Sequence, residues 1–181
     1  MSEICITPPT QSPAQGNKFA LSFSRIANTI FECTRTNIPG LNVAPKEQPT
    51  PFVNLFVPGN KIEFEPLNIE FIVDHQYNSW YDIFTWLTGE GFPESFDQYA
   101  KLSQNAIRRP GLAPSIGVRP PYSDATLILY TNKNNPQIRL QFFDCFPIDL
   151  SGIPVGYDVD ANTVLKATAS FRYSYYTFSR V

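Results

Sequence analysis

Side chains that commonly carry catalysis are few in this chain and widely separated. His75 is the single histidine, and Asp74 precedes it directly, so the two would point to opposite sides of an extended strand. A serine, histidine and aspartate triad would have to use this histidine. We interpret His75 instead as a residue at a corner between a strand and a helix. The sequence therefore predicts no catalytic residue and a protein that is not an enzyme.

The three cysteines, Cys5, Cys33 and Cys145, are far apart in the sequence. Zinc sites and disulfide frameworks use paired or short cysteine spacings, which are missing here. We interpret these residues as reduced cysteines in a cytosolic setting. The chain also has no Gly-Lys-Ser/Thr phosphate loop and no dinucleotide fingerprint, and its nine glycines leave little material for one. We expect neither a metal ion nor a cofactor.

Two pairs of carboxylates could act together if the fold brought them close. Glu63 and Glu65 share one face of a predicted strand, and Glu94 and Asp97 share a predicted turn. Hydrolysis of a glycosidic bond uses two carboxylates at a defined separation in space, which sequence spacing does not determine. We favour the interpretation that both pairs form a solvated acidic surface. An enzyme with dispersed acidic catalysts is kept as an alternative.

Charge is nearly balanced, with 14 Lys and Arg against 16 Asp and Glu, and the basic residues are scattered apart from Arg108 and Arg109. Binding of nucleic acid by charge neutralisation needs a basic patch. The sequence therefore predicts neither specific nor salt-sensitive DNA affinity. The alternative is that the fold gathers dispersed charges onto one face.

Residues 1–4 carry neither the basic start nor the apolar run of a signal peptide. No window approaches 18 apolar residues, so we expect no membrane-spanning segment and no membrane partner.

Alternating apolar residues predict a mainly β fold, an antiparallel β-sandwich or open barrel with one packed α-helix. The 17 prolines and the aromatic content of 14% favour many short strands. Strands are predicted at 19–23, at 30–35 as its returning partner, and at 52–57, 61–64, 67–73, 125–131, 137–143 and 164–178. The expected organisation is an extended N-terminal arm over 1–16 and a single domain over 17–181, with a long loop at about 103–123.

The clearest predicted helix begins near Ser79, which could act as its N-cap with Asp82 at the capping-box spacing. Trp80, Ile83, Phe84 and Leu87 fall on one helical face, which we expect to be core, and Gly89 and Gly91 are expected to end the helix. A further helical turn is predicted at 97–102.

Residues 52–57 form a short apolar segment between prolines, with apolar side chains on both faces. Such a segment is either a core strand or a strand that a neighbouring subunit covers. No Lys or Glu protects it as an exposed edge would be protected. The interface interpretation assigns subunit contacts to Phe52, Val53, Leu55, Phe56 and Val57.

The order of these segments resembles the tail tube proteins of contractile-tailed bacteriophages. The resemblance covers about residues 17–178. It rests on an opening strand at 17–19, an aromatic-x-Cys strand at 31–33, the Ile-Pro-Gly motif at 38–40, and a turn at 57–61 before the strand residues 64–69. It also rests on Asp74 before a helix with Trp86 near its end, an aromatic-Pro segment at 146–153, and an aromatic closing strand at 171–176. Each motif is common by itself, and their order and spacing carry the likeness.

The resemblance implies a structural protein of the virion tail, assembled in the host cytoplasm. Its partners would be copies of itself, in a hexameric ring with a continuous inner β-barrel and in stacked rings. Sheath and baseplate proteins would be further partners, and DNA would pass without specific binding. The proline-rich arm and the 103–123 loop depart from the tube pattern, so a baseplate tube initiator or a tube cap ring is an alternative. A carbohydrate- or peptide-binding β-sandwich module is another.

Overall fold

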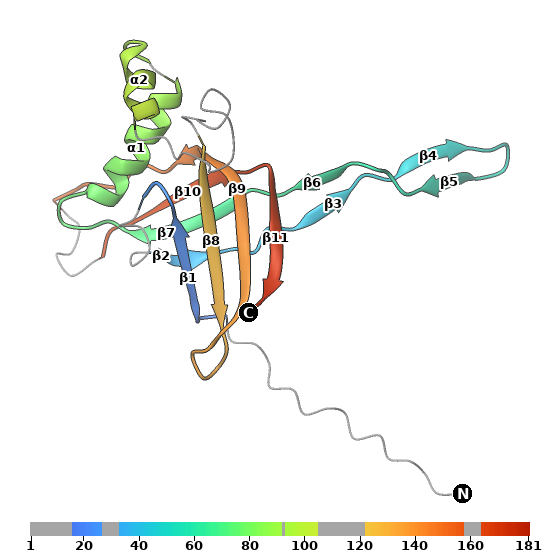
Figure 1. Cartoon of the computed structure of the whole chain (residues 1–181). Coiled ribbons are helices and arrows are strands. Elements are labelled where there is room, and N and C mark those ends of the chain that lie inside the picture. The colour runs from blue at the N-terminus through green and yellow to red at the C-terminus, as the bar shows by residue number, and fades with distance from the viewer. Residues whose placement is uncertain (1–15, 27–32, 92, 105–121, 158–163) are drawn as a thin grey trace, which may run out of the picture.

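The computed structural model describes residues 16–26, 33–91, 93–104, 122–157 and 164–181. Most of the predicted N-terminal arm and of the predicted 103–123 loop lies outside these residues, so the boundaries of both stay predictions. Figure 1 shows a body of strands, with a pair of helices at one end and a long two-stranded arm that leaves the body to the side.

One half of the body, sheet A, consists of four antiparallel strands in the order β1-β8-β9-β11. Their bounds are β1 (Phe19–Phe23), β8 (Ser123–Tyr130), β9 (Pro136–Leu150) and β11 (Tyr175–Arg180). The turn between β8 and β9 is the predicted hairpin, in which Asn134 takes a positive φ of 62°. Sheet A confirms the predicted strands at 19–23, 125–131 and 137–143.

The other half, sheet B, runs in the order β9-β10-β7-β2, so that the long strand β9 belongs to both halves. The remaining strands are β10 (Lys166–Arg172), β7 (Leu67–Ile72) and β2 (Cys33–Thr36). Strand β9 bends at Asp144, a buried residue with a φ of 56°. The Asp144 N–H donates to Asp124 Oδ1 at 3.3 Å, and Asp144 Oδ2 accepts from Ser174 Oγ at 3.3 Å. These bonds hold a bulge that turns one strand into both sheets.

The core lies between the two sheets and is rich in aromatic rings. Phe23 of sheet A contacts Phe171 of sheet B with ring centroids 4.7 Å apart, and Phe142 contacts Tyr173 at 5.0 Å. Strand alternation supplies most of the other buried apolar residues, namely Leu21, Leu67, Ile69, Phe71, Leu127, Leu140, Ala167 and Ala169. The mainly β fold with a packed helix is therefore confirmed.

Two predicted strand arrangements are wrong. Strand β2 does not return beside β1, because β1 pairs with β8 and β2 pairs with β7 in the other sheet. The predicted long strand at 164–178 is two strands, because the strand is interrupted at residues 173–174. The second strand, β11, pairs with the first half of β9. Both errors concern pairing between segments that lie far apart in the sequence.

Helix α1 (Asn78–Gly91) is present, but its buried face is not the predicted one. Ser79, Ile83, Trp86 and Gly89 are buried, whereas Phe84 is 40% exposed. Gly89 does not end the helix. It packs closely against Leu102 of helix α2 (Asp97–Gln104), where an added Cβ would crowd the leucine side chain.

Asp74, rather than Ser79, caps α1. Its Oδ1 accepts hydrogen bonds from the Ser79 N–H at 3.3 Å and from Ser79 Oγ at 3.2 Å. Partial burial acts to raise the pKa of Asp74, but hydrogen bonds from Ser79, Gln76 and Asn78 outweigh it and hold the pKa below its usual value. The predicted capping serine is thus a donor to the true cap.

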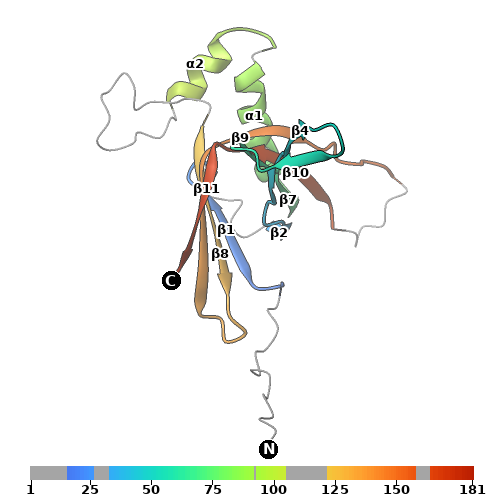
Figure 2. The ribbon, with the colours of Figure 1, turned by 90° about the vertical axis from the view of Figure 1, so that its right-hand side faces the viewer.

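The arm is built from two short antiparallel ladders. Strand β3 (Leu41–Val43) pairs with β6 (Ile62–Phe64) near the body, and β4 (Lys46–Pro49) pairs with β5 (Asn54–Val57) farther out. Figures 1 and 2 show that the arm leaves the body between β2 and β7. The core interpretation of residues 52–57 is wrong for the single subunit, because all of strand β5 is exposed.

Candidate assembly surfaces

The residues considered for chemistry are not brought together. His75 is exposed at the bend before α1. Burial raises the pKa of Cys145 to about 12 and that of Cys33 to about 11, so neither thiol is ionised near neutral pH. Glu65 accepts a hydrogen bond from the Gly40 N–H at 3.2 Å, and Glu94 accepts one from Gln98 at 3.4 Å. Both carboxylates take part in local structure.

Within the described ranges, no group of three or more His, Cys, Asp or Glu side chains is arranged to hold a metal ion. No helix in the described part of the chain is long and apolar enough to cross a membrane.

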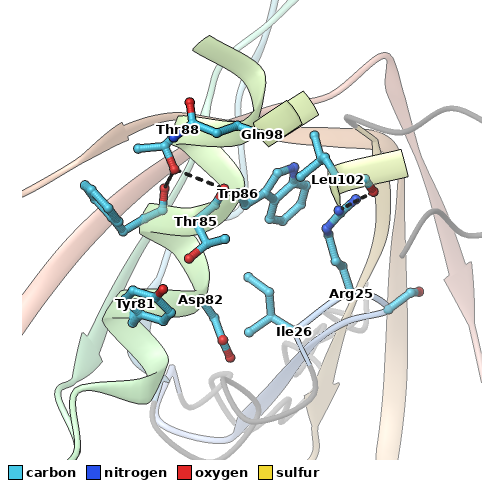
Figure 3. Close-up of a pocket in the computed structure, with 12 residues that line it drawn as sticks. Arg25, Ile26, Tyr81, Asp82, Thr85, Trp86, Thr88, Gln98 and Leu102 are labelled. Atoms are coloured by element: carbon cyan, nitrogen blue, oxygen red, sulfur yellow. Dashed lines mark hydrogen bonds between the residues drawn. The ribbon is translucent and has the colours of Figure 1, made fainter. Parts of the chain in front are cut away.

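A groove of about 530 Å³ lies between α1, α2 and the end of β1 (Figure 3). Arg25 sits with its guanidinium carbon 5.4 Å from the Trp86 ring centre and donates a hydrogen bond to the Leu102 carbonyl at 2.9 Å. Asp82 also lines the groove, and burial followed by the charge of Asp74 raises its pKa. The groove is lined by one carboxylate and by no histidine or cysteine.

The outer face of sheet A is polar and almost uncharged at its centre. Register places Ser22, Thr126, Gln141 and Thr177 in one row across the four strands, and Ala20, Ile128, Arg139 and Ser179 in the next. The opposite face of the same strands packs on the core. In these two rows sheet A presents hydroxyl and amide side chains, together with Ala20, Ile128 and the exposed Arg139.

Strands β1 and β11 are the two open edges of sheet A: β1 pairs with β8 alone and β11 with β9 alone among the described strands. Neither strand contains Pro, Asp or Glu, and the one charged residue within them is Arg180 at the end of β11. Protected edges usually carry charges, prolines or bulges. These two edges have the features of strands that another chain can extend.

The outer arm carries apolar side chains without a cover. Phe52 is 98% exposed at the turn, and Val53, Leu55, Phe56 and Val57 are all exposed as well. Thr50 Oγ1 donates to the Val53 carbonyl and accepts from the Val53 N–H, which closes the turn that presents Phe52. Exposed apolar surface of this kind is typical of an interaction site.

The chain matches the family model for phage tail tube protein over residues 3–179. It belongs to the phage tail tube protein family. This result confirms the resemblance noted in the sequence, and the mainly antiparallel fold agrees with it.

Among curated proteins, this tail tube family member is 27% identical over 119 residues to the tail tube terminator protein of Enterobacteria phage T4. The match covers 66% of this chain and 58% of the terminator, so the chain spans less than two thirds of that relative.

Solved structures of two anti-feeding prophage parts share the fold. A chain of the baseplate, described as 6-fold symmetrised, has a TM-score of 0.61 at 15% identity, covering 93% of this chain and 97% of that one. The tube terminating cap has a TM-score of 0.60 at 13% identity, covering all of both chains. A chain of the sheath/tube terminator complex of an extracellular contractile injection system has a TM-score of 0.53 at 14% identity, covering 94% and 99%.

For this tail tube family member, the five residues predicted at an interface lie together at the arm tip, and their role stays a prediction. Sequence reasoning missed the open edges β1 and β11, because edge position depends on which strands pair across the chain. It also missed the exposed apolar residues of the inner arm, Leu41, Val43 and Ile62. Their alternation with polar residues resembles that of any half-buried strand.

Proposed function

We propose that the chain forms a hexameric ring of a phage tail tube, through which DNA passes. The observation that carries this proposal is the pair of unprotected edges, β1 and β11, on opposite sides of one four-stranded sheet. Edge strands of this kind are hazardous in a free subunit, and closing a sheet into a barrel removes them.

Strand direction favours closure between β11 of one subunit and β1 of the next. Each of the four strands runs opposite to its neighbour, so β1 and β11 also run in opposite directions. Joining them keeps the antiparallel pattern around the ring. Sheet B packs against the core side of sheet A, so closure is sterically easiest with the open face toward the axis.

Six subunits would then line a lumen with rows of Ser, Thr, Gln, Ala and Ile side chains, with Arg139 in one row and Lys18 at one end. A conduit should not hold its cargo strongly, and a wall with few charges makes few contacts to phosphates. The 6-fold description of the anti-feeding prophage baseplate supports the number six. The work of such a ring would be structural, as the family and the T4 relative suggest.

The arm tip would contact a neighbouring subunit through Phe52, Val53, Leu55, Phe56 and Val57. Sheath and baseplate proteins would be further partners, and assembly would take place in the host cytoplasm before incorporation into the virion tail. Support for these partners comes from the complexes in which the structurally similar chains occur.

A position at the end of the tube is the more specific form of this proposal. The T4 relative is a tail tube terminator, and the anti-feeding prophage cap has the same fold over its whole length. An end ring stops growth of the tube, whereas a repeated subunit propagates it. Purified protein that stays as single rings at high concentration would support the end ring, and long open tubes would support the repeated subunit.

Ring closure can be tested at Phe178. The Val181 N–H donates to the Gln137 carbonyl at 3.0 Å, so alternation along an antiparallel ladder turns the Phe178 N–H away from β9 and toward the open edge. Phe178→Pro removes this edge donor, while Phe178→Ala keeps it and removes the same ring. We expect wild type and Phe178→Ala to form rings in light scattering and negative-stain images, and Phe178→Pro to stay folded but monomeric. Monomeric wild-type protein at all concentrations would contradict the ring.

A further inference from the structure

One end of sheet A is strongly basic. Lys18 precedes β1, Lys133 lies in the turn between β8 and β9, Arg139 follows on β9, and Arg180 ends β11. Figures 1 and 2 both show this end on the side of the body opposite the helices. We name these four residues the basic end.

Backbone pairing brings the basic end together. The Tyr130 N–H donates to the Lys18 carbonyl at 3.0 Å, and Lys18 Nζ donates to the Asn132 carbonyl at 2.6 Å. Arg139 pairs with Ile128 on one side and with Ser179 on the other. Four adjacent strands at about 4.8 Å spacing span about 15 Å across this end of the sheet. Register puts Lys18 and Arg139 on the open face and Arg180 on the opposite face.

The described segments that form this end carry no acidic side chain. Residues 16–20, 128–139 and 177–181 contain no Asp or Glu. The acidic residues of sheet A, Asp124, Asp144 and Asp149, lie toward its other end, as do those of α1 and α2. The fold thus concentrates four of the 14 Lys and Arg on one end of a chain whose overall net charge is −2.

We infer that the basic end is a sequence-independent binding site for the phosphate backbone of nucleic acid. The position of this site at one mouth of a ring rests on the proposed function. The four cations themselves belong to a single subunit. This inference revises the expectation of no salt-sensitive DNA affinity, because pairing gathers charges that the sequence disperses.

The surroundings of the basic end favour nucleic acid over an acidic protein. The turn carries Thr131, Asn132, Asn134 and Asn135, and Gln137 follows it. Hydroxyl and amide groups add hydrogen bonds to phosphate oxygens, and the turn itself carries none of the apolar or aromatic anchors that a protein partner usually meets. Strand alternation also puts Lys18 and Arg139 on the open face of sheet A, which the ring would turn toward its lumen.

The test uses the full chain and two labelled 25-base-pair duplexes of unrelated sequence, with binding followed by fluorescence anisotropy from 50 to 150 mM salt. The variant Lys133→Gln with Arg139→Gln removes two exposed cations. Arg35→Gln with Lys166→Gln makes the same charge change on sheet B and serves as the matched control. The mass of every sample is measured in the same buffers.

We expect wild type and control to bind both duplexes equally, and more weakly than about 1 µM at 150 mM salt. The basic-end variant should bind at least about tenfold more weakly at 50 mM salt, with a slope of log K against log salt that is shallower by about 2, for two lost phosphate contacts. This outcome supports the inference whether or not rings form.

Equal binding by variant and wild type would overturn the inference and leave the ring untouched. Displacement of DNA by an equal charge of poly-glutamate at lower concentration than by unlabelled DNA would also overturn it, since the basic end would then be a site for an acidic protein surface. If the basic-end variant weakens DNA binding but the wild-type chain forms no ring, the binding site at the basic end is supported and the proposed function is contradicted.

Discussion

Trp86 joins three parts of the molecule at one side chain. It is 1% exposed on α1, its ring lies 5.9 Å from that of Phe171 on β10, and Arg25 beyond β1 sits over its other side at 5.4 Å. Phe84, two residues earlier, stacks on Trp80 at 5.2 Å but remains 40% exposed. The helix is therefore held to the sheets by Trp86 and Ile83, and Phe84 lies outside this contact.

Truncating the two rings should separate these roles. Trp86→Ala empties a core site and should lower the free energy of unfolding by about 3–5 kcal/mol. Phe84→Ala removes an exposed stacked ring and should cost about 1 kcal/mol. Urea unfolding of both variants measures the difference. Equal losses would mean that Phe84 is as buried in the native protein as the sequence pattern predicts.

Sequence periodicity located this helix but could not choose its buried face. Apolar residues occur at 80, 81, 83, 84, 86 and 87, so two overlapping stripes satisfy helical spacing. The choice depends on what α1 meets, and it meets Phe171 and Leu102, which are distant in sequence. The cap was misassigned for a related reason, since Asp74 and Ser79 are both good caps and the bend at residues 75–77 decides between them.

Glu90 near the end of α1 gives the protein a pH-dependent stability. Burial raises its pKa to about 7, although Arg25 and a hydrogen bond from Trp86 act in the opposite direction. One of its carboxylate oxygens is buried with no hydrogen-bond partner among the described residues. Because the folded-state pKa exceeds the ordinary value of 4.5, the native protein binds a proton between about pH 4.5 and 7 that the unfolded chain releases.

Stability should therefore fall as pH rises through this window. Relative to Glu90→Gln, wild type should lose about 1–2 kcal/mol between pH 5 and pH 8, a value reduced from the full shift because the carboxyl group is partly exposed. Glu94→Gln at an exposed site is the control and should follow wild type. Urea midpoints at the two pH values measure the effect, and parallel curves for wild type and Glu90→Gln would contradict it.

At the scale of elements, the sequence predicts which segments form strands, but it does not predict which strands pair with each other. Phe19, Leu21 and Phe23 alternate clearly, yet their partner is β8, more than 100 residues away, rather than the nearby β2. Local turn signals identify hairpins such as β8–β9. They carry no information on a strand such as β9, which changes sheets at the buried bulge of Asp144. The surfaces proposed for assembly depend on this pairing, which is why the open edges were not predicted.

The arm is the element whose sequence is hardest to explain in a free subunit. Register puts Gln48 opposite Leu55 and Lys46 opposite Val57, so Val53, Leu55 and Val57 share one face of the outer ladder, and Asn54 lies on the other. Val53→Lys or Leu55→Lys should therefore leave a folded but unassembled protein. Asn54→Lys adds the same charge to the opposite face, which also carries Phe56, and tests whether the neighbouring subunit covers that face as well.

Circular dichroism and light scattering distinguish the outcomes for the arm. If both Val53→Lys and Leu55→Lys unfold, strand β5 belongs to the core of the subunit, which would contradict its exposed position in the arm. Normal assembly of both would mean that this face of the arm meets solvent, and the interface would have to lie elsewhere.

At the scale of the whole molecule, the arrangement is asymmetric in a way that suits a closed ring. The open face of sheet A carries mainly polar side chains, and its other face packs on the core shared with sheet B. The two ends of the sheet differ in charge, with the basic end on one side and the acidic helices on the other. A head-to-tail contact between different edges gives a ring if the rotation closes and an open filament if it does not.

The geometry of sheet A predicts the size of the hole. Six copies of four strands at about 4.8 Å spacing give a backbone diameter of about 37 Å for upright strands and about 48 Å at a tilt of 40°. Class averages of negatively stained rings should therefore show six-fold symmetry and a central hole somewhat narrower than this range, because side chains occupy its rim. Their mass should be six times the 20.5 kDa of the chain. Rings of another symmetry would keep edge closure but change the subunit number, whereas helical filaments without a central hole would show that β1 and β11 do not close on each other.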